Sequence, residues 1–78
     1  MQTIEYKVVI QKDEENRSWW AYCPDLPGCN SIGDTLEEVK INIKEAILGY
    51  LEVLESMKKD VPMPSEDNLI IEKVPITI

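Results

Sequence analysis

Carboxylates are the side chains of this 78-residue chain that are best suited to chemistry. The pairs nearest in sequence are Asp25 with Asp34 and Glu37 with Glu38. Two acids held close together can bind Mg²⁺ or divide the roles of general acid and general base. A minimal metal-dependent nuclease using Asp25, Asp34 and Glu37 is therefore one candidate function.

The rest of the composition weighs against catalysis. The chain has no histidine, so the commonest proton shuttle and metal ligand is missing. No serine lies on a Gly-x-Ser-x-Gly turn, and no glycine-rich loop has phosphate-binding spacing. Thr35 and Glu38 form a capping box at a helix start, and Glu37 complements the helix dipole, so both acids have structural uses. We therefore expect a protein that is not an enzyme and holds no metal or cofactor.

The two cysteines are predicted to be reduced core residues rather than a bridge. The spacing of Cys23 and Cys29 fits neither a zinc pair nor a redox Cys-x-x-Cys motif. No neighbouring base would create a thiolate, and a free cysteine behaves as a small hydrophobic residue.

Net charge and length bound the class of protein. Fifteen acidic and eight basic residues give a formal charge of −7, which disfavours contact with nucleic acid and favours basic protein partners. The sequence has no run long enough to span a membrane and no signal peptide, so we expect a cytoplasmic protein. We expect residues 1–78 to form a single domain, and so small a domain gains from a partner subunit.

Three strands are predicted before a helix. Ile4, Tyr6, Val8 and Ile10 alternate with other residues from Thr3 to Lys12, the pattern of a strand with one buried face. A polar turn leads to a second strand, Ser18 to Cys23, which has Trp20 and Tyr22 on the face opposite Ala21. A short third strand over Cys29 to Ile32 completes the meander.

The loop and helix start beyond the second strand are the most specific local signals. Pro24 and Pro27 stiffen the loop, and Gly28 and Gly33 supply conformations that residues with a Cβ resist. Beyond Thr35, an apolar stripe at three- and four-residue steps predicts a helix of about six turns that ends at Lys58-Lys59. Its members are Leu36, Val39, Ile43, Ala46, Ile47, Tyr50, Leu54 and Met57.

A final strand and an α+β fold complete the expected domain. The prolines of Val61 to Ser65 end the helix, and Leu69 to Val74 regains strand composition, with Pro75 limiting the last residues to an edge strand or a bulge. The predicted order is βββαβ, a two-layer sandwich with one long helix on a small, mostly antiparallel sheet. Ile41 and Leu48 lie opposite the main stripe, either as ordinary exposed residues or as an oligomer interface.

A cluster of motifs resembles the HicB antitoxin family over nearly the whole chain. The matching residues are Trp20 and Tyr22, Pro24 through Cys29, Gly33-Asp34-Thr35, Glu37-Glu38, Glu45-Ala46 with Tyr50, and Pro62-Met63-Pro64. The chain departs from the family in having Val39 where alanine is common. It also ends at Ile78 without the carboxyl-terminal DNA-binding module of many relatives, so the resemblance does not carry operator binding.

The resemblance implies a partial RNase H-like fold without the catalytic carboxylates of true nucleases. It also implies a partner, a HicA-type toxin, which is a small basic mRNA-cleaving protein that the antitoxin covers. Trp20, Tyr22 and Leu26 are the candidate apolar anchors for that partner, and Asp25 and Asp34 are the candidate acidic contacts.

Three functions fit these observations. The leading hypothesis is an antitoxin that masks a HicA-type toxin, and the alternatives are an orphan self-associating structural domain and the minimal nuclease. For both binding hypotheses we expect a homodimer or higher oligomer.

Overall fold

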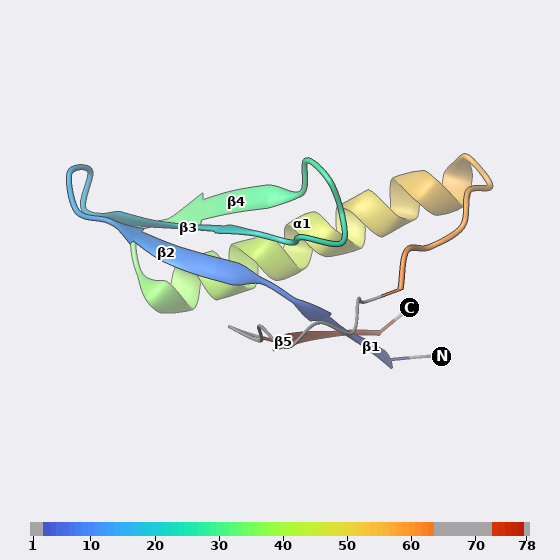
Figure 1. Ribbon diagram of the computed structural model, residues 1–78, viewed down its shortest axis with the longest axis horizontal. Coiled ribbons are helices and arrows are strands. Elements are labelled where there is room, and N and C mark those ends of the chain that lie inside the picture. Colours follow the sequence, from blue (N-terminus) through green and yellow to red (C-terminus); the bar gives the residue numbers. More distant parts are fainter. Residues whose placement is uncertain (1–2, 64–72, 78) are drawn as a thin grey trace.

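One long helix packs on small antiparallel sheets, as expected for the α+β class (Figure 1). The computed structural model describes residues 3–63 and 73–77. The elements in chain order are β1 (Thr3–Lys7), β2 (Val9–Asp13), β3 (Ser18–Tyr22), β4 (Asn30–Gly33), α1 (Leu36–Ser56) and β5 (Lys73–Thr77).

The predicted first strand is divided between two sheets. β1 pairs with β5, from Thr3 opposite Thr77 to Lys7 opposite Lys73, whereas β2 pairs with β3. Val8, between the two strands, is fully buried, and so is Tyr6. The alternation thus predicted the buried face correctly but not the change of partner, which a twisted strand makes possible by presenting successive segments to different neighbours.

β2, the second half of the predicted first strand, forms the meander with the next two predicted strands. The sheet order is β2-β3-β4 with both pairs antiparallel. In the hairpin turn between β2 and β3, the Asp13 carboxylate accepts hydrogen bonds from the amides of Glu15 (3.1 Å) and Asn16 (3.3 Å). These bonds fix the first residues of the turn, and Arg17 completes it in a left-handed conformation at φ 50°.

Helix α1 begins where the sequence predicts. The Thr35 hydroxyl accepts a hydrogen bond from the Glu38 amide at 3.0 Å. Within residues 3–63 and 73–77, the reciprocal bond from the Glu38 carboxylate to the Thr35 amide is not formed, so the cap is one-sided. The helix ends at Ser56, two residues before the predicted lysines, and Lys58 adopts a φ of 57°.

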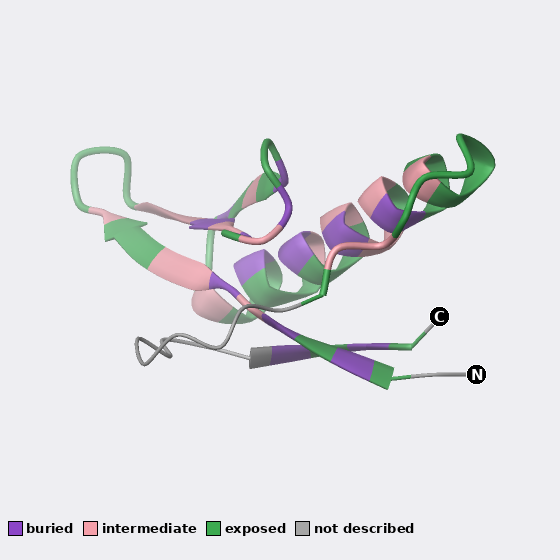
Figure 2. Ribbon diagram, turned by 45° about the vertical axis from the view of Figure 1, so that its right-hand side comes forward, coloured by how far each residue is buried: buried purple, intermediate pink, exposed green. Residues whose placement is uncertain are grey.

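The buried face of α1 differs from the predicted stripe at two places. Figure 2 shows the buried positions along the side of the helix that faces the strands, and they are Val39, Ile43, Ile47 and Leu51. Leu51 was missing from the stripe, and Met57 is 55% exposed because it lies past the last helical turn. Leu48 is half-buried and packs against the core, which corrects its expected place on the open side of the helix.

The two ends of the described chain lie side by side. Thr3 and Thr77 bring their hydroxyl oxygens within 3.2 Å, and Ile76 of β5 is fully buried. Pro75 is exposed opposite Glu5, in keeping with its expected edge position. The Tyr6 hydroxyl donates a hydrogen bond to the Pro62 carbonyl and so ties the segment after α1 to β1. The predicted strand residues 69–72, and Pro64 and Ser65 of the connector, lie outside the described residues.

Candidate protein-binding surface

The proline loop between β3 and β4 is closed by its own backbone. The Cys23 amide donates to the Cys29 carbonyl at 3.0 Å, the Leu26 amide to the Cys23 carbonyl at 3.1 Å, and the Cys29 amide to the Leu26 carbonyl at 2.9 Å. Gly28 takes the left-handed conformation that the turn requires, at φ 84°. The loop is therefore a small rigid unit that ends β3 and starts β4.

Leu26 anchors this loop to the hydrophobic core. Its side chain has no exposed surface and belongs to the hydrophobic core. The prediction that Leu26 contacts a partner is wrong for this structure, because the loop turns that side chain inward while Pro24 and Pro27 remain exposed.

Both cysteines are free and buried, as predicted. Burial raises the pKa of the Cys23 thiol from 9.0 to about 11 and also raises the pKa of Cys29. Thiolate, the reactive form, is therefore scarce at neutral pH.

The face of the three-stranded sheet that points away from α1 carries stacked aromatic rings. The rings of Trp20 and Tyr22 have centroids 5.5 Å apart and an interplanar angle of 20°. Ile32 of β4 lies opposite Trp20 and is 70% exposed, and Val9 of β2 lies opposite Tyr22 and is half-buried. Directly paired residues share one face of a sheet, so these four side chains form one surface, which we call the sheet-face patch.

Ile32 was not among the residues predicted from sequence to bind a partner. The signal that could have found it is the register, because in a short strand that ends at Gly33 and pairs with β3, alternate residues face opposite sides.

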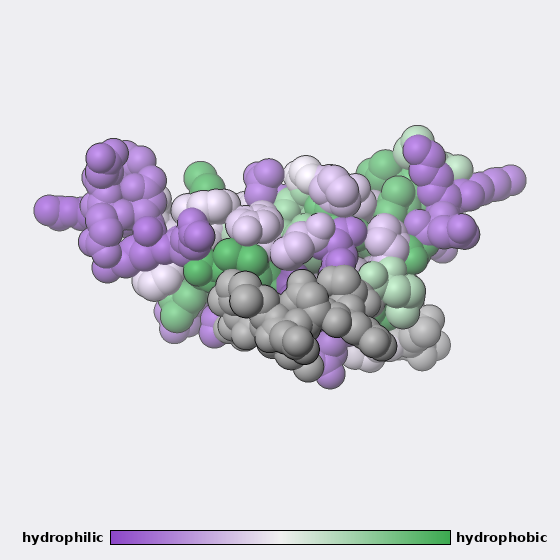
Figure 3. Space-filling view, in the orientation of Figure 1, coloured by the Kyte–Doolittle hydropathy of each residue, from purple (hydrophilic) through white to green (hydrophobic). Residues whose placement is uncertain are grey.

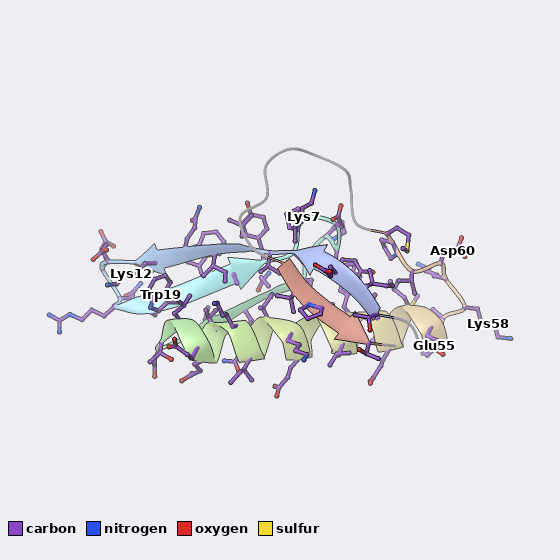
Figure 4. The ribbon with its side chains drawn as sticks, turned by 90° about the horizontal axis from the view of Figure 1, so that it is seen from below. Lys7, Lys12, Trp19, Glu55, Lys58 and Asp60 are labelled. Atoms are coloured by element: carbon purple, nitrogen blue, oxygen red, sulfur yellow. The ribbon has the colours of Figure 1, made fainter. Side chains whose placement is uncertain are left out.

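The second tryptophan lies on the other face. Trp19 follows the side of β3 that faces α1, is half-buried against the core, and has the Lys12 ammonium 5.8 Å from its ring centroid (Figure 4). Trp19 is therefore occupied by its cation–π contact with Lys12 and by packing against the core. Trp20 is the tryptophan on the face that points away from α1.

The candidate acidic residues are not brought together. Asp25 lies in the proline loop, before β4 begins, and exposed Asp34 follows its last residue. A four-residue strand at ~3.3 Å per residue therefore separates the two carboxylates by about 10 Å or more. Within the described ranges, no three side chains of the metal-binding types form a group that could hold an ion. The structure thus gives no geometric support to the nuclease hypothesis.

Gly33 allows the close approach of β4 to the start of α1. A β-carbon at this position would lie 2.6 Å from the Val39 nitrogen and 2.9 Å from the Val39 α-carbon. The reason for glycine here is therefore contact with the helix backbone, which differs from the conformational reason predicted from sequence.

The two oligomer-interface candidates differ in accessibility. Ile41 is 59% exposed on α1, whereas Leu48 packs against the core. In the described part of the chain, no helix is both long and apolar enough to cross a membrane.

Comparison with known proteins identifies the family. Residues 6–74 match the family described as the HicB-like antitoxin of bacterial toxin–antitoxin systems. The chain belongs to this family. A UPF0150 protein of Synechocystis is 40% identical over 77 residues, which cover 99% of this chain and 92% of that protein. A UPF0150 protein of Thermoplasma acidophilum is 37% identical over 68 residues, which cover 87% and 97% of the two chains.

Solved structures share the fold of this HicB-like chain. The crystal structure of the N-terminal domain of Burkholderia pseudomallei antitoxin HicB matches with a TM-score of 0.76 at 22% identity, over 96% of this chain and 98% of that domain. The structure of the longer Burkholderia pseudomallei antitoxin HicB matches with a TM-score of 0.71, and this chain covers 64% of it. The fold class predicted from sequence is thereby confirmed.

Proposed function

We propose that this chain is an antitoxin that binds and masks a HicA-type mRNA-cleaving toxin and performs no chemistry of its own. Membership of the HicB-like family supports the antitoxin role. The observation that carries the binding mode is the sheet-face patch, where two stacked aromatic rings and Ile32 lie uncovered by the helix.

The sheet-face patch has the composition of a protein interface. Aromatic side chains bury much area for little loss of conformational entropy and dominate the energetics of many interfaces. Trp20 and Tyr22 are already stacked on each other, so they lose little further freedom when a partner covers them. We therefore place the main anchor at Trp20, with Ile32 beside it.

The acidic charge supports a basic partner. At −7, the chain attracts a cationic protein from a distance and speeds its association. Asp34 lies exposed beside the end of β4, and we propose it as a charged contact at the rim of the sheet-face patch. Rim charges affect the association rate more than the affinity, so the aromatic anchors must supply most of the binding energy.

The proposal is tested by co-expressing this chain with a small basic HicA-type protein from its own genome. We expect the two proteins to co-purify and this chain to relieve the growth arrest that the toxin causes. Trp20→Ala should weaken the complex by roughly tenfold or more, the loss of about 1.4 kcal/mol that a hot-spot residue exceeds.

A matched pair of isoleucines controls for general effects. Ile32 and Ile41 are both largely exposed, but only Ile32 belongs to the sheet-face patch. Ile32→Ala should weaken toxin binding and Ile41→Ala should not. Unchanged affinity with Trp20→Ala and Ile32→Ala would refute the binding mode, and failure of the wild-type pair to co-purify would refute the antitoxin proposal.

A further inference from the structure

A second apolar surface lies between the start of β4 and helix α1. It is an open groove of about 420 Å³ on a different side of the molecule from the sheet-face patch. Its lining comes from two segments, Gly28, Cys29 and Asn30 on one side and Ala46, Gly49, Tyr50, Val53 and Leu54 of α1 on the other. We call it the α1 groove.

The helical wall of the α1 groove continues as an exposed apolar strip. Val53 lines the groove and is 56% exposed, and Met57 lies one turn later and is 55% exposed. Figure 3 shows hydrophobic side chains gathered around this carboxyl-terminal half of α1. From Ala46 to Met57 the strip is about 16 Å long at ~1.5 Å per residue, which matches roughly three turns of a second helix.

The shape of this wall suits a helix as the occupant. Gly49 has open space where a side chain would stand, since a β-carbon added there would have nothing within 4 Å, and Ala46 is also small. Small residues let a second helix approach the backbone of the first closely. The larger Val53 and Tyr50 lie about 40° and 100° around the axis from Gly49, both on the same side, and would contact the apolar face of that helix.

Charge along the rim indicates the chemistry of the occupant. Glu45 and Glu52 lie four and three residues from Gly49, so they are its neighbours on the helix surface. Both are exposed, and among the described residues neither has an ion-pair partner. Lys40 and Lys44 lie on the far side, about 180° and 140° around the axis from Gly49 at ~100° per residue.

The structure thus points to a docking site, and we propose that the α1 groove binds a basic amphipathic helix of a partner protein. The apolar face of that helix would cover Ala46, Gly49 and Val53, and its cations would reach Glu45 and Glu52. A second copy of this chain fits less well, because it would bring the same acidic rim and a further charge of −7 to the contact. This inference goes beyond the antitoxin proposal, since it concerns a separate surface and does not require the toxin to be its ligand.

The test uses a synthetic probe instead of a natural partner. A fluorescent peptide of roughly 14 residues, about four helical turns, would carry leucine on one face and lysine on the other. A control peptide would carry glutamate in place of each lysine. By fluorescence anisotropy, we expect saturable binding of the lysine peptide to the intact protein and binding of the glutamate peptide weaker by about tenfold or more.

Matched variants place the binding site. Val53 and Ile41 are similarly exposed on the same helix, but only Val53 lines the groove, so the uncharged Val53→Asn should lower the affinity about tenfold or more and Ile41→Asn should change it less than about twofold. Glu52→Gln should weaken binding more than Glu55→Gln, because Glu55 lies about 120° from Gly49, roughly twice the angle of Glu52. Circular dichroism of each variant would show that α1 is intact.

Three results would overturn the inference. The first is the absence of saturable binding by the lysine peptide, and the second is equal binding to the Val53→Asn and Ile41→Asn variants. The third is a loss with Trp20→Ala as large as that with Val53→Asn, which would place the peptide on the sheet-face patch. Toxin binding is measured in a separate co-purification experiment. None of these three outcomes therefore bears on the antitoxin proposal.

Discussion

Gly33 shows how a single atom sets the distance between strand and helix. A β-carbon there would overlap the backbone of Val39, and backbone cannot give way as a flexible side chain can. Gly33→Ala should therefore lower the free energy of unfolding by about 1–3 kcal/mol, the usual cost of overpacking.

Denaturant unfolding would measure this loss, and Gly49→Ala supplies the control. Gly49 lies within α1 with open space around its α-carbon, so alanine there should raise the stability by up to ~1 kcal/mol through helix propensity. If both alanine variants were equally stable, the close contact at Gly33 would not be stabilising the fold.

The buried thiols predict a dependence of stability on pH. The pKa of the Cys23 thiol is near 9.0 in the unfolded chain and about 11 in the folded one, because burial disfavours the thiolate. Between these values the folded state holds a proton that the unfolded state has released, so the free energy of unfolding should fall as pH rises from about 9 to about 11. Burial raises the pKa of Cys29 and of Tyr6 as well, and both act in the same direction.

Urea unfolding across this pH range would measure the decline. In Cys23→Ala the decline should be shallower than in the parent chain. Equal slopes for the two proteins would show that the thiol does not carry the effect.

Helix α1 depends on its first turn for a defined start. Since the Thr35 hydroxyl accepts the Glu38 amide but the Glu38 carboxylate makes no return bond in the described chain, the cap rests on Thr35. Thr35→Ala should lower the free energy of unfolding by ~1 kcal/mol. Glu38→Gln should change it by only a few tenths of a kcal/mol, and a loss as large as that of Thr35→Ala would indicate a two-sided capping box in solution.

The two sheets differ in how far apart their paired strands lie in sequence. β2, β3 and β4 follow one another along the chain and pair in that order, whereas β1 must find β5 from the opposite end. Tyr6 anchors β1, because its side chain is fully buried and its hydroxyl donates to the Pro62 carbonyl in the segment after α1. The end-to-end pair therefore brings the two ends of the described chain together, with β5 in contact with α1.

The charge of the whole molecule should affect the kinetics of toxin binding. Salt shortens the screening length from about 30 Å at 0.01 M to about 3 Å at 1 M. The association rate with a basic toxin should fall by about tenfold or more over this range, whereas dissociation, which depends on contacts at the sheet-face patch, should change much less. Stopped-flow tryptophan fluorescence of a Trp19→Phe variant, which leaves Trp20 as the one tryptophan of this chain, would measure both rates. An association rate independent of salt would exclude steering by the charge of −7.

Local signals explain what could be predicted from sequence. The helix start at Thr35, the hairpin turn at Asp13, the meander and the buried alternation of Ile4, Tyr6 and Val8 each depend on residues close together in the chain. The free cysteines and the HicB-like family followed from composition and from a continuous motif cluster.

Contacts between distant residues decided the rest. No local pattern tells that Thr3 pairs with Thr77, so the division of the first strand emerged only in the folded chain. The exposure of a side chain likewise depends on what packs over it, so Leu26 is buried and Ile32 is exposed. The distance between Asp25 and Asp34 depends on the strand β4 that lies between them. The chain thus encodes its elements locally, but the surfaces that bind partners exist only where packing leaves apolar side chains uncovered.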